Sequence, residues 1–196
     1  MCRWLAYSGR PIYLDAALFE PENSLIEQSL HARHGRWLFM HNGAIGGYNQ
    51  VRHQLDLLID PAFYPRRAGT TDSETFFYLM LSHGLEEDAE GALARTIAQV
   101  VAVMEEAGVD APFHMTAALS NGARVHALRW SNDRKSPSLF HGKPCFDAAR
   151  GAEDEAVAIL SEPLDSNGEN WTPVPEGHLL VAEGSQVTVK PFSPAA

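Results

Sequence analysis

The spacing of apolar residues changes along the chain, and this change predicts where helices and strands lie. Apolar residues recur every three or four positions over residues 48–59 and 89–107, as is typical of helices with a buried face. A third helix is predicted for residues 69–83, and because it is nearly all apolar we expect it to be buried. Shorter apolar runs separated by polar turns predict strands: residues 3–8, 36–41, 113–119, 123–130, 139–140, 156–161 and 178–189. A capping-box pattern over residues 24–27 predicts a further short helix that ends near residue 32. Helices and strands gathered in separate runs predict an α+β class with largely antiparallel sheets.

Composition and charge narrow the possible function classes. The chain has 196 residues, of which 45% are hydrophobic and 20% charged, so we expect one ordinary globular domain over residues 1–196. Its formal net charge of −10 repels phosphate backbones and argues against a nucleic-acid partner. No apolar run approaches the ~20 residues that span a bilayer, and the N-terminus lacks the pattern of a signal peptide. Two cysteines are too few for a disulfide framework, so we expect a cytoplasmic protein with no membrane partner.

Cys2 is the first candidate catalytic residue. Met1 before a small residue is usually removed during maturation, which would leave Cys2 with both a thiol and a free α-amino group. The reference pKa values are about 8.5 for a thiol and about 7.7–8.0 for an α-amine, so the amine can act as the base for its own side chain. The alternative is a cysteine without a catalytic role. The second cysteine, Cys145, lies between Pro144 and Phe146, and we expect it to be a small apolar residue of the interior.

Asn42 and Gly43 form the second candidate feature, at the end of the strand predicted for residues 36–41. Acyl transfer needs hydrogen-bond donors aimed at the oxyanion of the tetrahedral intermediate. An Asn side-chain amide and the backbone N–H of a glycine can supply two such donors. The alternative is an ordinary turn that ends the strand, because both residues tolerate a positive φ.

Asp72 is the third candidate and lies in the segment Thr71-Asp72-Ser73-Glu74. Its carboxylate is suited to bind a cationic group of a ligand, such as an α-ammonium. The alternative is purely structural, because Thr71 and Glu74 form a capping box and acidic residues favour the first turn of a helix.

Nine histidines raise the alternative of a metal-binding protein. His31, His34 and His41 are close in the sequence, but no pair has the spacing of a recognised ligand motif. We therefore expect no metal and no other cofactor.

The three candidate features occur together and in one order, and in this respect the chain resembles the class II glutamine amidotransferases, a family of N-terminal nucleophile hydrolases. The resemblance is strongest to small, stand-alone bacterial amidotransferase-domain proteins, a group that includes γ-glutamyl hydrolases. It is carried by five segments: MCRWLAYSG at 1–9, SLIEQSLHAR at 24–33, RWLFMHNGAI at 36–45, TDSETFFYLML at 71–81 and SEPL at 161–164.

The resemblance implies a fold, a reaction and the roles of four residues. The family fold is a four-layer α/β/β/α sandwich. Cys2 would attack the side-chain amide of glutamine or of a γ-glutamyl compound and form a thioester, with Asn42 and Gly43 as the oxyanion-hole pair. Asp72 would hold the α-ammonium group of this small-molecule substrate. Any ammonia would pass to solvent or to a separate acceptor, and no metal is implied.

The chain departs from the family pattern near residues 33–36. Members carry a long stretch here, with an arginine that binds the α-carboxylate of the substrate, a natural task for a guanidinium. In this chain several dozen of those residues are absent, and no arginine matches the missing one. The nearest in sequence are Arg33, Arg36, Arg66 and Arg67. The sequence therefore predicts a cysteine-dependent amidohydrolase, with an impaired amidotransferase-like binding or scaffold protein as the alternative.

Overall fold

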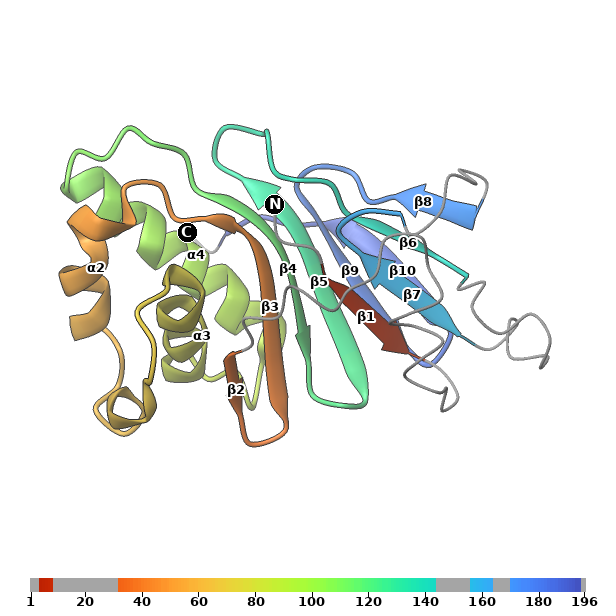
Figure 1. Cartoon of the computed structure of the whole chain (residues 1–196), viewed down its shortest axis with the longest axis horizontal. Helices are drawn as coiled ribbons and strands as arrows, with labels where there is room; N and C mark the ends of the chain where they lie inside the picture. Colours follow the sequence, from red (N-terminus) through yellow and green to blue (C-terminus); the bar gives the residue numbers. More distant parts are fainter. Residues whose placement is uncertain (1–3, 9–31, 144–155, 164–169, 195–196) are drawn as a thin grey trace. The chain divides into compact units, whose positions relative to one another are not determined.

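The computed structural model describes residues 4–8, 32–143, 156–163 and 170–194 of the chain (Figure 1). The strands are β1 (Leu5–Ser8), β2 (Ala32–His34), β3 (Trp37–Ala44), β4 (His114–Ser120), β5 (Arg124–Ser131), β6 (Phe140–Gly142), β7 (Val157–Leu160), β8 (Trp171–Pro173), β9 (His178–Glu183) and β10 (Gln186–Pro191). The helices are α2 (Tyr48–Leu57), the short 3₁₀ helix η1 (Tyr64–Arg66), α3 (Asp72–Ser82) and α4 (Ala89–Glu106).

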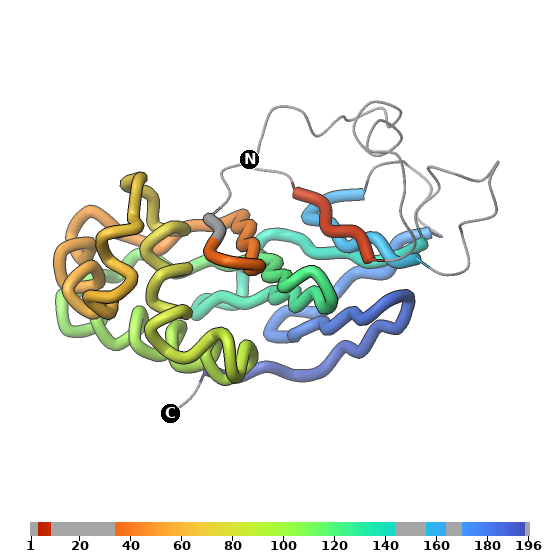
Figure 2. Tube along the Cα trace, turned by 90° about the horizontal axis from the view of Figure 1, so that it is seen from below, coloured from red at the N-terminus to blue at the C-terminus, as the bar shows by residue number. Residues whose placement is uncertain are grey.

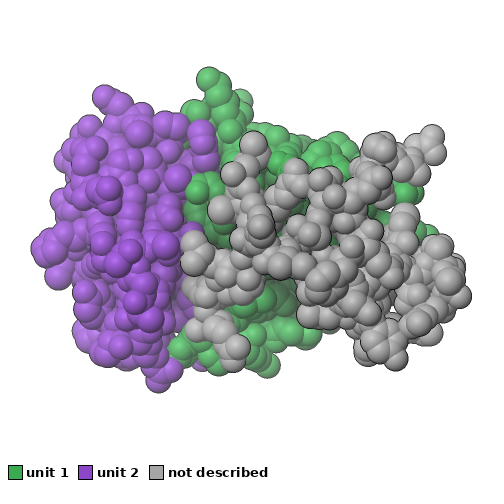
Figure 3. Space-filling model, viewed as in Figure 1, with its two compact units in different colours: residues 1–43, 115–191 green, residues 44–114, 192–196 purple. Residues whose placement is uncertain are grey.

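The chain divides into two compact units (Figure 3). Unit 1 comprises residues 1–43 and 115–191, and unit 2 comprises residues 44–114 and 192–196. Among the described residues, unit 1 holds the strands and unit 2 holds the helices, apart from one residue at the end of β3 and one at the start of β4.

The strands of unit 1 form two sheets. A four-stranded sheet has the order β1-β7-β6-β8, and a six-stranded sheet has the order β10-β9-β5-β4-β3-β2. The strand pairs β1–β7, β6–β7, β6–β8, β5–β9, β9–β10 and β2–β3 are all antiparallel. Figure 2 shows the sheet that holds β1 as a layer beside the sheet that holds β9 and β10.

An apolar core fills the space between the two sheets of unit 1. Alternate residues of each strand face this core, as the two-residue period of a strand requires. The cluster consists of Trp4, Ala6, Met40, Ala118, Val125, Ala127, Leu139, Val157, Ile159, Val174, Leu180 and Ala182. It joins the start of β1 to the middle of β3, which are far apart in the sequence.

The chain passes directly from β2 to β3 through a tight hairpin. His34 lies opposite Trp37 and Ala32 opposite Phe39, so Gly35 and Arg36 form a two-residue turn. Gly35 has a φ of +57°. The first position of a two-residue hairpin turn needs a positive φ, and glycine adopts it readily. The short connection near residues 33–36 therefore forms regular structure.

In unit 2, α3 shows why the sequence pattern predicts a buried helix. All of its residues from Thr75 to Leu81 are buried. Its N-cap Thr71 accepts a hydrogen bond from the backbone N–H of Glu74 through its side chain, at 3.3 Å. The Glu74 carboxylate accepts from the backbone N–H groups of Ala68 and Gly69, at 2.9 and 2.7 Å. Thr71 thus caps the helix as predicted, while Glu74 fastens the preceding loop.

The predicted α+β class with antiparallel sheets is confirmed, and the three long helices lie where apolar spacing predicts them. One local prediction is wrong: β3 does not end before Asn42-Gly43 but continues through both residues to Ala44. Gly43 has a φ of +153°, a conformation that glycine adopts without strain, and the strand continues through it. The helix predicted for residues 24–32 lies almost wholly outside the described residues.

Candidate functional site

The predicted nucleophile, Cys2, lies outside the described residues, and the described chain begins two residues later at Trp4. Trp4 is buried, with 5% of its surface exposed. Its backbone N–H donates to Ser161 Oγ at 3.2 Å, and its backbone carbonyl accepts from the N–H of Ser161 at 3.3 Å. Its indole Nε1–H donates to the carbonyl of Thr116, on β4, at 3.3 Å. Trp4, the described residue nearest to Cys2 in the sequence, is therefore held through both its backbone and its side chain.

Asn42 and Gly43 lie near the end of β3, in the same unit as Trp4. Asn42 is buried, with 6% of its surface exposed. Met40, two residues before Asn42, packs in the same inter-sheet cluster as Trp4. Gly43 has a φ of +153°, which residues with a Cβ rarely adopt. The core thus brings Trp4 and Met40, each two residues from a candidate residue in the sequence, into one apolar cluster.

Asp72 is the first residue of α3, in unit 2. Its Oδ2 accepts from the backbone N–H of Ile45 at 2.9 Å, and its Oδ1 accepts from the N–H of Ser73 at 2.8 Å. Ile45 follows Gly43 by two residues in the chain. Each carboxylate oxygen has two lone pairs, so Asp72 keeps acceptor capacity for an ammonium ligand. A carboxylate at this position is also favoured by the N-terminal field of the helix.

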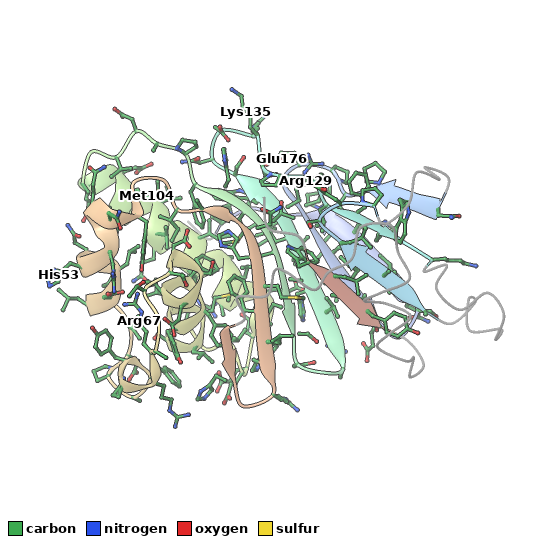
Figure 4. All side chains as sticks on the ribbon, viewed as in Figure 1. His53, Arg67, Met104, Arg129, Lys135 and Glu176 are labelled. Carbon is green, nitrogen blue, oxygen red and sulfur yellow. The ribbon has the colours of Figure 1, made fainter. Side chains whose placement is uncertain are left out.

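A polar network in unit 2 fixes the loop that leads to α3, and it centres on Arg67 (Figure 4). The Arg67 guanidinium forms an ion pair with Asp56 and donates from Nη2 to Tyr48 Oη at 3.0 Å. Tyr48 Oη also shares a 2.6 Å hydrogen bond with Thr75 Oγ1, which donates to Asp56 Oδ1 at 3.1 Å. Only 6% of the Arg67 side chain is exposed. Burial raises the pKa of Tyr48, so the phenol stays protonated in this network.

This network bears on the missing carboxylate-binding arginine. Arg67 is buried and committed to Asp56 and Tyr48, so it is not available to bind a substrate carboxylate. Arg36 is exposed in the turn between β2 and β3, and Arg66 ends η1. The side chain of Arg33 lies outside the described residues.

The metal-binding alternative gains no support from the described residues. Within them, no three His, Cys, Asp or Glu side chains are grouped so that they could hold a metal ion. The ring of His41 stacks on Phe39, with 6.0 Å between ring centroids. No helix in the described part of the chain is long and apolar enough to cross a membrane.

Sequence reasoning missed the residues that support the candidate site. Ser161 and Thr116 hold Trp4, and Arg67 with Tyr48 holds the loop before Asp72. Their partners lie 19 to 157 positions away in the chain, too far for any periodicity to indicate them. Ser161 does begin the segment SEPL, so its place in a motif was the one available signal.

Comparison with solved structures finds matches that cover most of this chain. A glutamine aminotransferase class-II domain protein from Silicibacter pomeroyi superposes with a TM-score of 0.84 and 30% sequence identity, over 100% of both chains. Glutamine phosphoribosylpyrophosphate amidotransferase from B. subtilis, complexed with ADP and GMP, has a TM-score of 0.56 and 13% identity. The match covers 86% of this chain and 32% of that larger one, and it shows a shared fold. No protein-family model matches the chain, and no curated protein matches it significantly.

Proposed function

The chain belongs to the class II glutamine amidotransferase domain family, and from this premise we propose that it is a cysteine-dependent amidohydrolase acting on glutamine or a γ-glutamyl compound. The observation that carries the proposal is the full-length match at 30% identity to a class II domain protein. The burial of Asn42 and the acceptor capacity of Asp72 support it. The short hairpin between β2 and β3 does not prevent an end-to-end superposition with that relative.

The proposed reaction has two halves. In the first, the α-amine of Cys2 takes the proton of its own thiol, and the sulfur attacks the side-chain amide carbon of the substrate. The tetrahedral intermediate carries its negative charge on the former carbonyl oxygen. It collapses as the C–N bond breaks, and the nitrogen leaves with the transferred proton as ammonia or an amine. In the second half, water attacks the thioester, which releases the acid and restores the thiol.

Asn42 and Gly43 are proposed as the two donors for that oxyanion. The buried side chain of Asn42 supports this role, because a donor that is shielded from water is stronger than an exposed one. The positive φ of Gly43 supports it too, since a glycine lets the reacting group approach the backbone closely. Asp72 is proposed to hold the α-ammonium group of the substrate through the acceptor capacity that Ile45 and Ser73 leave unused.

The proposal retains several expectations from the sequence. Residues 1–196 act as one amidotransferase domain in the cytoplasm, and no nucleic acid or membrane takes part. Ammonia is passed to solvent or to a separate acceptor. A net charge of −10 supports the exclusion of nucleic acid.

The experiment is ammonia release from glutamine and from a γ-glutamyl amide, measured on the full chain with intact-mass determination. We expect the mature protein to lack Met1 and to release ammonia, and Cys2→Ala to reduce the rate to background. Cys145→Ala is the matched control, because it removes the other cysteine and should leave the rate unchanged. Retention of Met1, or full activity in Cys2→Ala, would refute the proposal.

The second candidate function is a binding or scaffold protein that has lost catalysis. It is favoured by the commitment of Arg67 to Asp56 and Tyr48 and by the two-residue turn between β2 and β3, where the resemblance implies a segment with a carboxylate-binding arginine. This alternative predicts no heat of glutamine binding by calorimetry and an ammonia rate equal to that of Cys2→Ala. Turnover above that background rejects it.

A further inference from the structure

We propose that Ser161 is a positioning residue for the N-terminal cysteine, because its hydroxyl fixes the backbone of Trp4 two residues after Cys2. Ser161 is fully buried, with 0% of its surface exposed. The inference rests on the proposed function, since it assigns Ser161 a task only if Cys2 is the nucleophile.

The hydroxyl of Ser161 takes the place of a backbone carbonyl at the end of a strand ladder. Leu5 and Leu160 are an opposed pair of β1 and β7, so the next pair along would be Trp4 and Ser161. The N–H of Ser161 donates to the carbonyl of Trp4, as a regular ladder would have it. The carbonyl of Ser161, however, accepts from Ser138 Oγ at 2.8 Å. The N–H of Trp4 donates to Ser161 Oγ instead, so one side chain completes the ladder.

The side chain of Trp4 provides a second, independent anchor. Its Nε1–H donates to the carbonyl of Thr116 in the six-stranded sheet, while its backbone leads directly into β1 of the four-stranded sheet. The indole also packs in the cluster that contains Met40, two residues before Asn42. A change in the backbone of Trp4 would therefore alter the start of β1 relative to the proposed oxyanion donors of β3.

Residues 131–138 support Ser161 through Ser138, and hydrogen bonds hold this segment in place. Glu176 accepts hydrogen bonds from Ser131 and Ser136 and lies 3.7 Å from the guanidinium of Arg129 (Figure 4). Pro137 follows Ser136 in the chain, and its carbonyl accepts a hydrogen bond from Thr116 Oγ1 at 2.7 Å. Ser138, which follows, donates to the carbonyl of Ser161. The carbonyl of Ser161 is thus occupied by Ser138, and the hydroxyl of Ser161 is the acceptor of the Trp4 N–H.

Removal of this hydroxyl should affect the chemical step more than substrate binding. The N–H of Trp4 would lose its acceptor, and the two residues before it would be less well placed. A displacement of about 1 Å at a reacting atom can cost on the order of a hundredfold in rate. We therefore expect Ser161→Ala to lower kcat by about 10- to 100-fold while KM for glutamine changes by less than about twofold.

The experiment compares three variants of the full chain. Ser161→Ala removes the acceptor of the Trp4 N–H. Ser161→Thr retains a hydroxyl and should restore most of kcat. Ser138→Ala is the matched control, because it removes a hydroxyl that binds the same serine but leaves the acceptor of Trp4 in place. Thermal unfolding of each variant shows whether the fold is intact, and hydrogen exchange of the Trp4 amide reports the anchor without any need for activity.

The proposal is supported if kcat falls in Ser161→Ala alone and the Trp4 amide exchanges faster there, by on the order of tenfold. It is overturned if kcat of Ser161→Ala stays within about twofold of wild type, or if Ser138→Ala loses as much. A wild-type protein without glutamine hydrolysis contradicts the proposed function instead. The rate of Trp4 amide exchange then decides the anchor, and an unchanged rate in Ser161→Ala refutes it. If Ser161→Thr does not fold, the comparison of Ser161→Ala with Ser138→Ala still decides the outcome.

Discussion

Replacement of Arg67 by methionine should destabilise the protein strongly, because it leaves a nearly buried carboxylate without its main counter-charge. Arg67 is 6% exposed and its partner Asp56 is 13% exposed. After the replacement, Asp56 keeps the hydrogen bond from Thr75 at 3.1 Å and a contact of 3.6 Å with Arg52. The methionine retains most of the apolar stem of the arginine.

The size of the effect follows from these contacts. Breaking a buried ion pair by removing one partner costs roughly 3–5 kcal/mol in the free energy of unfolding. Asp56 keeps two other contacts, so the lower end applies, about 3 kcal/mol. For a chain of this length each kcal/mol lowers Tm by roughly 2–4 °C, so Tm should fall by about 6–12 °C.

Arg52→Met is the matched control, because Arg52 contacts the same carboxylate from an exposed position. Its side chain is 38% exposed and lies one helical turn from Asp56. Exposed pairs of this kind contribute roughly 0.3–0.5 kcal/mol. The assay is urea unfolding followed by circular dichroism, with Asp56→Asn combined with Arg67→Met to complete a double-mutant cycle. If Arg67→Met costs less than about 1 kcal/mol, or no more than Arg52→Met, the network does not hold the loop as we infer.

Three further predictions concern the candidate site and its support. Asn42→Ala should lower kcat for glutamine hydrolysis by on the order of 10²–10³ with little change in KM, and an equal change in both constants would contradict an oxyanion role. Asp72→Asn keeps an acceptor for Ile45 but loses its charge, so we expect KM for glutamine to rise about tenfold or more while kcat changes less; an unchanged KM argues against ammonium binding. Burial raises the pKa of Tyr48 above its ordinary value of 10.0, so the unfolded chain loses the phenol proton at a lower pH than the folded chain does. The contribution of Tyr48 to the free energy of unfolding is therefore lost as pH rises above 10.0. Urea unfolding between about pH 9 and 11 should therefore show a smaller loss of stability in Tyr48→Phe than in wild type, and identical slopes would refute the burial of the phenol.

The helices could be predicted because their formation is decided locally. Apolar spacing places α2, α3 and α4 within a few residues of their observed ends, and Thr71 caps α3 as the sequence indicates. The strands β2 and β8 have three residues each, too few for an alternating pattern, and neither was predicted. The Asn42-Gly43 pair was placed at the end of a strand because Asn-Gly favours turns, whereas sheet pairing keeps it extended in β3.

The candidate site was only partly predictable for a related reason. Cys2, Asn42, Gly43 and Asp72 stand in short motifs, so the sequence alone could single them out as candidates. The residues that hold them depend on tertiary contacts: Ser161 reaches Trp4 across 157 positions, and Arg67 reaches Tyr48 across 19. No local sequence pattern marks a serine whose hydroxyl completes a strand ladder. The same is true of an arginine whose side chain is buried against a helix.

The most direct test of the proposed reaction is to locate the covalent intermediate. The full chain is mixed with a γ-glutamyl substrate, quenched rapidly in acid, digested and mapped by mass spectrometry. We predict that the N-terminal peptide begins at Cys2 and carries the mass of one γ-glutamyl group, and that Cys145 carries none. Ammonia release without an acyl group on Cys2, or an N-terminal peptide that still begins with Met1, would contradict the account.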